Sequence, residues 1–112
     1  MRGSEVPKPA AWTLLERAIS DRLAVLARYH GHERTLCPHA LGWKNGRPKV
    51  LAYQAAGTTS LGALHDDPRQ RWRSMFVDEM ERPTISDHPW QTADNGSGQS
   101  NCFDEVYLTV NA

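Results

Sequence analysis

The chain lacks long apolar runs and a secretory leader, and it has few cysteines. No apolar stretch in its 112 residues approaches the roughly 20 that cross a bilayer, and residues 1–12 contain no continuous apolar segment. We therefore expect a cytoplasmic protein with no membrane partner. Cys37 and Cys102 are too few for a disulfide framework, so we expect two reduced thiols.

The chain also has no excess of positive or negative charge, because its formal net charge is zero. The charge is unevenly spread, however. Residues 1–49 carry nine Lys and Arg against four acids, and residues 50–112 carry four Arg against nine acids. The zero total argues against general affinity for nucleic acid through long-range charge, but a local basic groove could still form from the N-terminal arginines.

What is present is one helical pattern followed by several strand patterns. Trp12, Leu15, Ala18 and Ile19 recur at the spacing of one helix face, which predicts a helix over residues 10–22. Alternating or continuous apolar residues then predict strands. These strands cover residues 24–31, 34–43, 48–54, 71–86 and 102–110.

Turn signals separate these strands. Gly31 marks the first turn, and Asn45-Gly46 is the strongest hairpin signal in the chain. Pro38 lies inside the second strand and predicts an edge position or a bulge there. Residues 55–70 and 88–101 are rich in small and polar residues and predict mobile loops.

These elements predict a single domain over residues 10–112, preceded by a flexible N-terminus over residues 1–9. The fold class we expect is mainly β with one N-terminal helix. A small antiparallel sheet with one helix tends to close into a barrel, because closure removes exposed strand edges.

A cluster of His30, His32, Cys37 and His39 poses the question of a metal site. Zinc ligands usually arrive in pairs separated by two to four residues, whereas these pairs are separated by one. We therefore predict no metal and no other cofactor. The favoured interpretation is a hairpin whose exposed tip carries the histidines, with Cys37 as a small buried apolar residue.

A second motif places arginines at alternate positions. In residues 69–74, Arg69, Arg71 and Arg73 share one predicted strand face, and Trp72 lies between the last two. Guanidinium groups suit phosphate or carboxylate recognition, and an adjacent aromatic is common in nucleotide and single-strand binding. An exposed strand face with structural Arg–Asp pairs explains the same pattern equally well.

The order of elements over residues 14–86 resembles the WYL domain, a ligand-sensing module of bacterial transcription regulators. The resemblance rests on Ala18-Ile19, Tyr29, Arg34, Pro38, Leu41, Gly46, Leu51-Ala52-Tyr53 and Arg73. It implies an Sm-like small antiparallel β-barrel with an N-terminal helix. Few residues precede the helix, so we expect a stand-alone sensing module without its own DNA-binding domain.

The chain departs from the family pattern at three places. The Trp-Tyr-Leu tripeptide falls at residues 48–50, where only Val50 keeps the apolar character. Met75 stands for the usual Phe, and Glu79 stands for the usual second Arg. The charge reversal at Glu79 bears directly on whether an anion can bind.

The resemblance implies a ligand groove with Tyr29, Arg34 and Arg73, and the chemistry of the side chains adds three candidates to it. These are Arg71, Trp72 and Lys49. We expect a non-enzymatic module that senses a nucleotide, single-stranded nucleic acid or another anion. The alternative is a protein–protein interaction module, either a homo-oligomer or an accessory subunit of a regulatory protein, and an enzyme using the His/Cys cluster is the third hypothesis.

Overall fold

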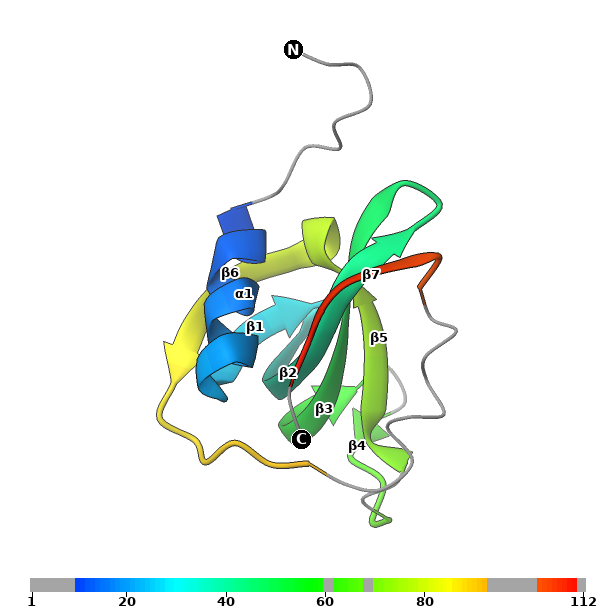
Figure 1. Cartoon of the computed structure of the whole chain (residues 1–112). Coiled ribbons are helices and arrows are strands. Elements are labelled where there is room, and N and C mark those ends of the chain that lie inside the picture. Colours follow the sequence, from blue (N-terminus) through cyan, green and yellow to red (C-terminus); the bar gives the residue numbers. More distant parts are fainter. Residues whose placement is uncertain (1–9, 60–61, 68–69, 93–102, 111–112) are drawn as a thin grey trace.

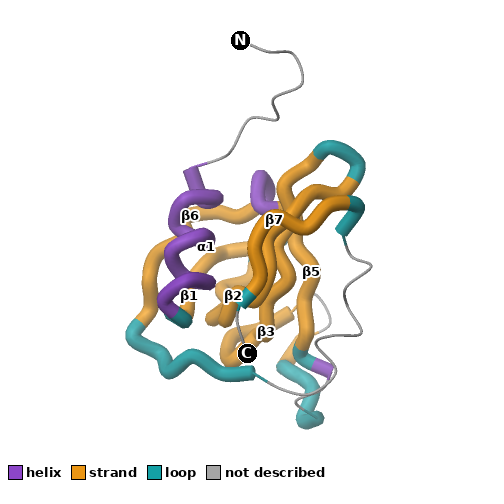
Figure 2. Tube along the Cα trace, in the orientation of Figure 1, coloured by secondary structure: helices purple, strands orange, loops and turns teal. Residues whose placement is uncertain are grey.

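The computed structural model describes residues 10–59, 62–67, 70–92 and 103–110. Figures 1 and 2 show one helix against a strongly twisted sheet. The elements follow in the order α1 (Ala10–Asp21), β1 (Ala24–Tyr29), β2 (His32–Lys44), β3 (Arg47–Thr59), β4 (Gly62–Ala63), β5 (Trp72–Phe76), the 3₁₀ helix η2 (Val77–Glu79), β6 (Met80–Ser86) and β7 (Glu105–Thr109).

The sheet is antiparallel throughout, with the strand order β4-β3-β2-β1-β6. Two further strands lie off this path: β5 pairs with β3, and β7 pairs with β2 beyond the end of β1. Within the described residues β5 and β6 do not pair with each other, so the sheet is not closed. The prediction of a mainly β, antiparallel fold with one helix is confirmed, and the barrel is not.

The helix forms where its apolar stripe predicts. Trp12, Leu15, Ala18 and Ile19 are all completely or almost completely buried. They pack against the inner face of the sheet, the face that carries Val25, Leu41 and Val50 among others. Figure 1 shows α1 alongside β1 and β6, so the main core lies between the helix and this inner face.

The turn predictions are confirmed by the backbone. His30-Gly31 and Asn45-Gly46 both adopt positive φ angles, as two-residue hairpin turns of the primed type require. The register of β2 with β3 shifts between Pro38 and Ala40. This irregularity is the bulge that Pro38 predicts, because proline cannot donate to the ladder.

Three element predictions need correction. β3 continues to Thr59 and β4 follows at Gly62–Ala63, inside residues 55–70 that were predicted as a loop. The single strand predicted over residues 71–86 is interrupted by η2. Local strand propensity cannot locate that interruption, because it depends on where β5 must turn to reach β6. The predicted N-terminal segment and most of residues 88–101 lie outside the described residues.

The outer face of the sheet carries a second apolar layer. Cys37, Tyr53 and Trp72 pack there, and Trp90 covers them from the segment that follows β6. Figure 2 shows this loop running from the β6 edge towards β2 and β3. The backbone N–H of Gln91 donates to the Cys37 Sγ at 3.2 Å, which fixes the segment to β2.

Candidate functional site

Two arginines reach the inner face of the sheet, where apolar residues are otherwise expected. Arg34 on β2 lies opposite Ala27 of β1, and Arg73 on β5 lies opposite Ala52 of β3. Both alanines belong to the main core. Since side chains alternate between faces along a strand, the two arginines point to the core side.

Arg34 is buried, and none of the acids among the described residues pairs with it. Its side chain is 4% exposed, and its Nε is enclosed without a hydrogen-bond partner. The nearest compensation is the ring of Tyr29, whose centroid lies 5.4 Å from the guanidinium carbon. A cation–π contact of this kind contributes about 0.5–2 kcal/mol, which is less than the usual cost of burying an unpaired charge.

Tyr29 adds a hydroxyl to the same place. The backbone N–H of Phe76 donates to the Tyr29 hydroxyl oxygen at 3.1 Å. Burial raises the pKa of Tyr29, so the phenol keeps its proton at neutral pH. The O–H proton is therefore a donor that the Phe76 contact does not use.

Arg73 is anchored through one of its terminal nitrogens. Its Nη1 donates to the carbonyl oxygens of Gln70 and Trp72, each at 3.0 Å. Burial lowers the pKa of Arg34, and the charge of Arg73 lowers it further. Burial also lowers the pKa of Arg73. The charge of Arg73 thus acts on Arg34, and both guanidinium groups face the same side of the sheet.

Glu79 is held by partners other than Arg34 and Arg73. Glu79 accepts a hydrogen bond from Arg47 at 2.7 Å and shares one with His30 at 2.6 Å. The bond to His30 is the largest cause that lowers the pKa of Glu79, and the bond to Arg47 follows. No ion pair between Glu79 and Arg34 or Arg73 occurs in the described part of the chain.

The neighbouring Asp78 also binds Arg47, at 2.8 Å. On a regular strand, Asp78 and Glu79 would point to opposite faces. The 3₁₀ turn η2 brings them to the same guanidinium instead. Both carboxylates therefore pair with Arg47.

Sequence reasoning missed two residues of β3, the strand that pairs with β2 at Arg34. Gln54 is fully buried, and its amide nitrogen donates to the carbonyl oxygens of Ala56 and Thr58, on both sides of Gly57. These two acceptors fix the amide orientation and leave Gln54 Oε1 enclosed without a donor. Gly57 lies opposite Arg34, and a Cβ there would come within 2.9 Å of the Arg34 Cα. The sequence signal that could have identified Gln54 was a polar glutamine directly after the apolar run of β3.

The other three predicted site residues do not join this group. Arg71 donates from its Nε to the carbonyl oxygen of His65 at 2.7 Å. Trp72 packs in the outer layer, with its ring centroid 5.6 Å from that of Tyr53. Lys49 lies over the ring of Phe76 at 5.0 Å, and strand alternation places it on the outer face too. Arg69 lies outside the described residues.

The histidine cluster separates in the fold. His30 binds Glu79, His32 binds the Thr58 hydroxyl at 3.0 Å, and His39 binds elsewhere. Within the part of the chain that the structure describes, no group of three or more His, Cys, Asp and Glu side chains is arranged to hold a metal ion. Cys37 is buried, as predicted.

His39 corrects the prediction that the histidines lie at an exposed tip. It is 8% exposed, stacked on Trp90 with ring centroids 4.4 Å apart and met edge-on by Trp72 at 4.6 Å. Its Nδ1 bonds the Cys37 carbonyl oxygen at 2.6 Å, and its Nε2 bonds the Thr92 hydroxyl at 2.9 Å. The carbonyl requires a proton on Nδ1, so Nε2 accepts from Thr92 in the neutral ring.

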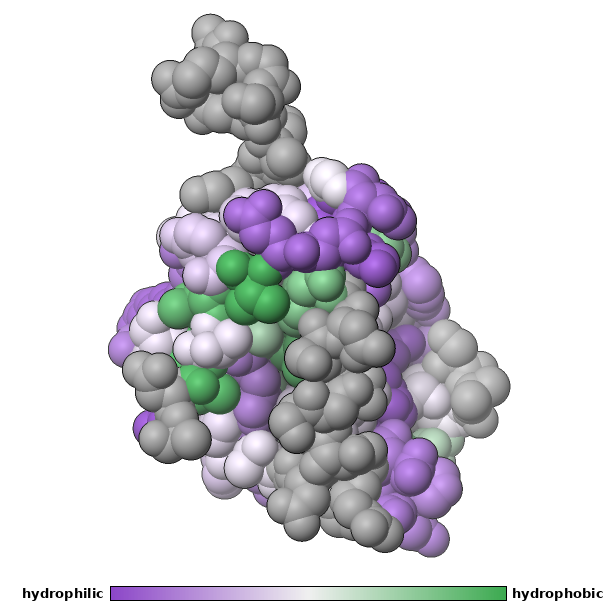
Figure 3. Space-filling model, turned by 45° about the vertical axis from the view of Figure 1, so that its right-hand side comes forward, coloured by the Kyte–Doolittle hydropathy of each residue, from purple (hydrophilic) through white to green (hydrophobic). Residues whose placement is uncertain are grey.

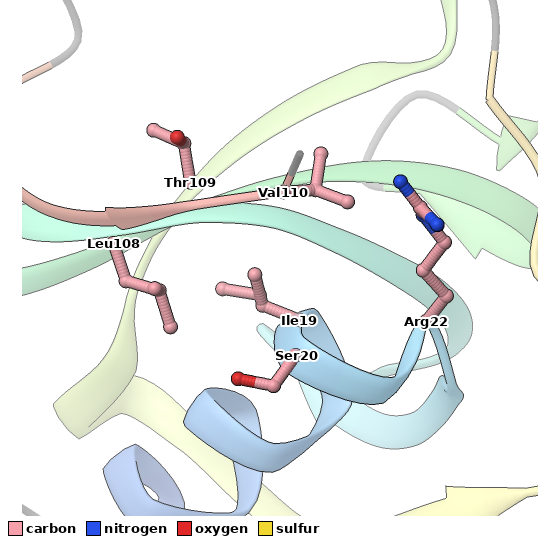
Figure 4. Close-up of a pocket in the computed structure, with 6 residues that line it drawn as sticks. All are labelled: Ile19, Ser20, Arg22, Leu108, Thr109 and Val110. Carbon is pink, nitrogen blue, oxygen red and sulfur yellow. The ribbon is translucent and has the colours of Figure 1, made fainter. Parts of the chain in front are cut away.

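A pocket of about 210 Å³ lies apart from Arg34 and Arg73, between the end of α1 and β7. Figure 4 shows its lining, with Ile19 and Ser20 at the end of α1, Leu108, Thr109 and Val110 on the segment above them, and the extended Arg22 at one side. The lining residues are Ile19, Ser20, Arg22, Leu108, Thr109 and Val110. The pocket combines apolar side chains with two hydroxyl groups and one cation.

Comparisons with known proteins return no match to any family model, to any curated protein or to any solved structure. No helix among the described residues is long and apolar enough to cross a membrane.

Proposed function

We propose that this chain is a non-enzymatic sensing module that binds an anionic ligand, such as a nucleotide or single-stranded nucleic acid, through Tyr29, Arg34 and Arg73. One observation carries the proposal: Arg34 is buried, its Nε has no partner and no acid pairs with it in the described chain. A buried charge without a partner is costly, and perturbed charges of this kind cluster at functional sites. We also propose that the module is WYL-like and has a small Sm-like barrel.

The proposed chemistry uses directed donors. Guanidinium groups match the geometry of phosphate and carboxylate oxygens, and charge-assisted hydrogen bonds are about twice as strong as neutral ones. Arg34 and Arg73 supply the charge, and the Tyr29 O–H supplies a third donor. Glu79 does not compete for the arginines, because His30 and Arg47 already bind it.

The test is a thermal-shift screen of the wild-type protein against nucleotides and short oligonucleotides, followed by calorimetry on any hit. Arg34→Ala and Arg73→Ala should each weaken binding about 10-fold or more, the effect of losing about 1.4 kcal/mol. Arg28→Ala is the matched control, since Arg28 is exposed and pairs with Glu81 at 3.6 Å. A wild-type protein that binds none of these compounds would end the proposal.

An interaction module is the second candidate function. Leu26 on β1 and Val106 on β7 expose 41% and 49% of their surface, and Figure 3 shows hydrophobic residues gathered on one face beside a hydrophilic band. A contiguous exposed apolar patch is typical of docking surfaces, and the face in Figure 3 is the candidate for one. Light scattering separates the candidates: a stable oligomer that responds to no anion favours the interaction module, and a monomer that binds anions favours the sensor.

A further inference from the structure

We infer that the ligand is compact and carries a terminal phosphate monoester or similar dianion, held by Arg34 and Arg73 together, and that it is not an extended strand. This inference rests on the proposed function and narrows its ligand class. Four steps support it: the charges near the site, the aromatic surfaces, the enclosure of Arg34, and the charge balance.

Arg28, Arg47 and Lys49 do not extend the charge of Arg34 and Arg73 into a continuous track. Arg47 is bound by Asp78 and Glu79, and Arg28 by Glu81. Lys49 belongs to the outer face, as described above. Proteins that bind single strands use a positive groove that follows many successive phosphates. The structure provides charge for one anionic group at this place.

Aromatic platforms for successive bases are also absent beside the arginines in the described chain. Tyr29 is only 7% exposed, and its ring already meets the His30 ring at 4.0 Å and the Arg34 guanidinium. Trp72 and Trp90 pack in the outer layer. Single-strand binding depends on stacking of each base on an accessible ring. The Tyr29 hydroxyl remains as the group through which this residue can contact a ligand.

Burial limits the size of the group that can contact Arg34. With 4% of the side chain exposed, only a small head group can contact the guanidinium without opening the core. A phosphate group is small enough and offers several acceptor oxygens. The Arg34 and Arg73 guanidinium groups face the same side of the sheet, and both retain donors for such a group.

Charge balance distinguishes the monoester from the diester. A phosphate monoester carries about −1.5 to −2 at neutral pH, whereas each diester of a nucleic acid backbone carries one negative charge. Two arginines that make no ion pair in the described chain are neutralised by a monoester and only half neutralised by a diester. A mononucleotide or another small phosphorylated metabolite therefore matches the site better than internal phosphates of a strand.

The experiment compares matched probes by calorimetry on the full chain. The probes are adenosine, adenosine 5′-monophosphate, inorganic phosphate, and a 15-mer of deoxythymidylate with and without a 5′-phosphate. We expect the monophosphate to bind at least 10-fold more tightly than adenosine, and the 5′-phosphorylated 15-mer at least 10-fold more tightly than the 5′-hydroxyl form. Log affinity should fall with log salt at a slope near −1 to −2, the value for one or two charges.

The outcomes separate this inference from the proposed function. If the 5′-hydroxyl 15-mer binds as tightly as the phosphorylated one, with a slope of several units and dependence on Arg34, the site binds strands and the inference is wrong. If no probe binds the wild type, the proposed function itself is wrong. Arg34→Met should abolish the preference for the monophosphate, while Arg28→Met should leave it within 2-fold.

Discussion

Arg34 places a charge where the fold would otherwise place an apolar side chain. Its neighbours across the strands are Ala27 and Gly57, and neither offers a group that could neutralise a guanidinium. A buried charge that is left unpaired opposes folding by more than the contact with Tyr29 returns. Ligand binding therefore explains the presence of Arg34 better than a contribution to folding stability does.

This view predicts the effect of Arg34→Met on stability. Methionine has a similar length, keeps apolar contact with the Tyr29 ring and removes the buried charge. We expect the free energy of unfolding to rise by about 1 kcal/mol while anion binding is lost. Urea unfolding measures the change, with the exposed Arg28→Met as a control expected to stay within about 0.5 kcal/mol. A loss of more than about 1 kcal/mol in Arg34→Met would mean that Arg34 stabilises the fold.

At the scale of elements, the close pairing of β2 with β3 positions Arg34. Gly57 has a φ of 97°, and a Cβ added there would meet the Glu33 carbonyl oxygen at 2.2 Å. Glycine alone accepts both the backbone angle and this close approach. The distance between the strands at Arg34 thus depends on one missing side chain.

Gly57→Ala should therefore destabilise the protein by about 2–4 kcal/mol, since the φ angle and the steric overlap both contribute. It should also weaken anion binding about 10-fold, because β2 must shift and Arg34 shifts with it. Gly46→Ala is the control, for Gly46 has a φ of 77° but open space around its Cβ position, so we expect about 1–2 kcal/mol and unchanged binding. Equal losses in both variants would show that only the φ angle matters.

A second link between elements joins β2 to the segment that follows β6. His39 contacts Trp90 and Thr92 of that segment, and burial lowers the pKa of His39. The pKa in the folded state is then below the unfolded value of about 6.5. The unfolded chain binds the proton more readily, so the stability that His39 provides is complete above about pH 6.5 and is lost as the pH falls below it.

The free energy of unfolding should consequently fall between pH 7.5 and pH 5, and His39→Phe should reduce that fall. Phenylalanine keeps the stacking with Trp90 and cannot titrate. Urea unfolding at four pH values measures both slopes. If the two proteins lose stability in parallel, His39 is not the group responsible.

At the scale of the whole molecule, local patterns were enough for most of the architecture. The helix stripe, the Asn45-Gly46 turn and the Pro38 bulge are each determined by a few neighbouring residues, and all three are confirmed. The η2 turn and the extension of β3 to Thr59 were missed. Both depend on pairing with strands that are distant in the sequence, which local propensity does not record.

The candidate site was predictable to a smaller extent. The resemblance to the WYL domain selected Tyr29, Arg34 and Arg73, and the structure brings Tyr29 and Arg34 into contact and Arg73 within electrostatic reach. Side-chain chemistry alone added Trp72 and Lys49, which strand alternation sends to the other face. The roles of Gln54 and Gly57 follow only from the way β2 and β3 pair.

The contact between Gln91 and Cys37 has a practical consequence. The Cys37 thiol is fully buried beneath the segment that follows β6, and burial raises its pKa, so a thiol reagent can react with it only when that segment lifts. The modification rate of Cys37 in a Cys102→Ser background therefore measures how often this segment opens. It reports motion of one surface segment in the native protein, with no probe attached beforehand.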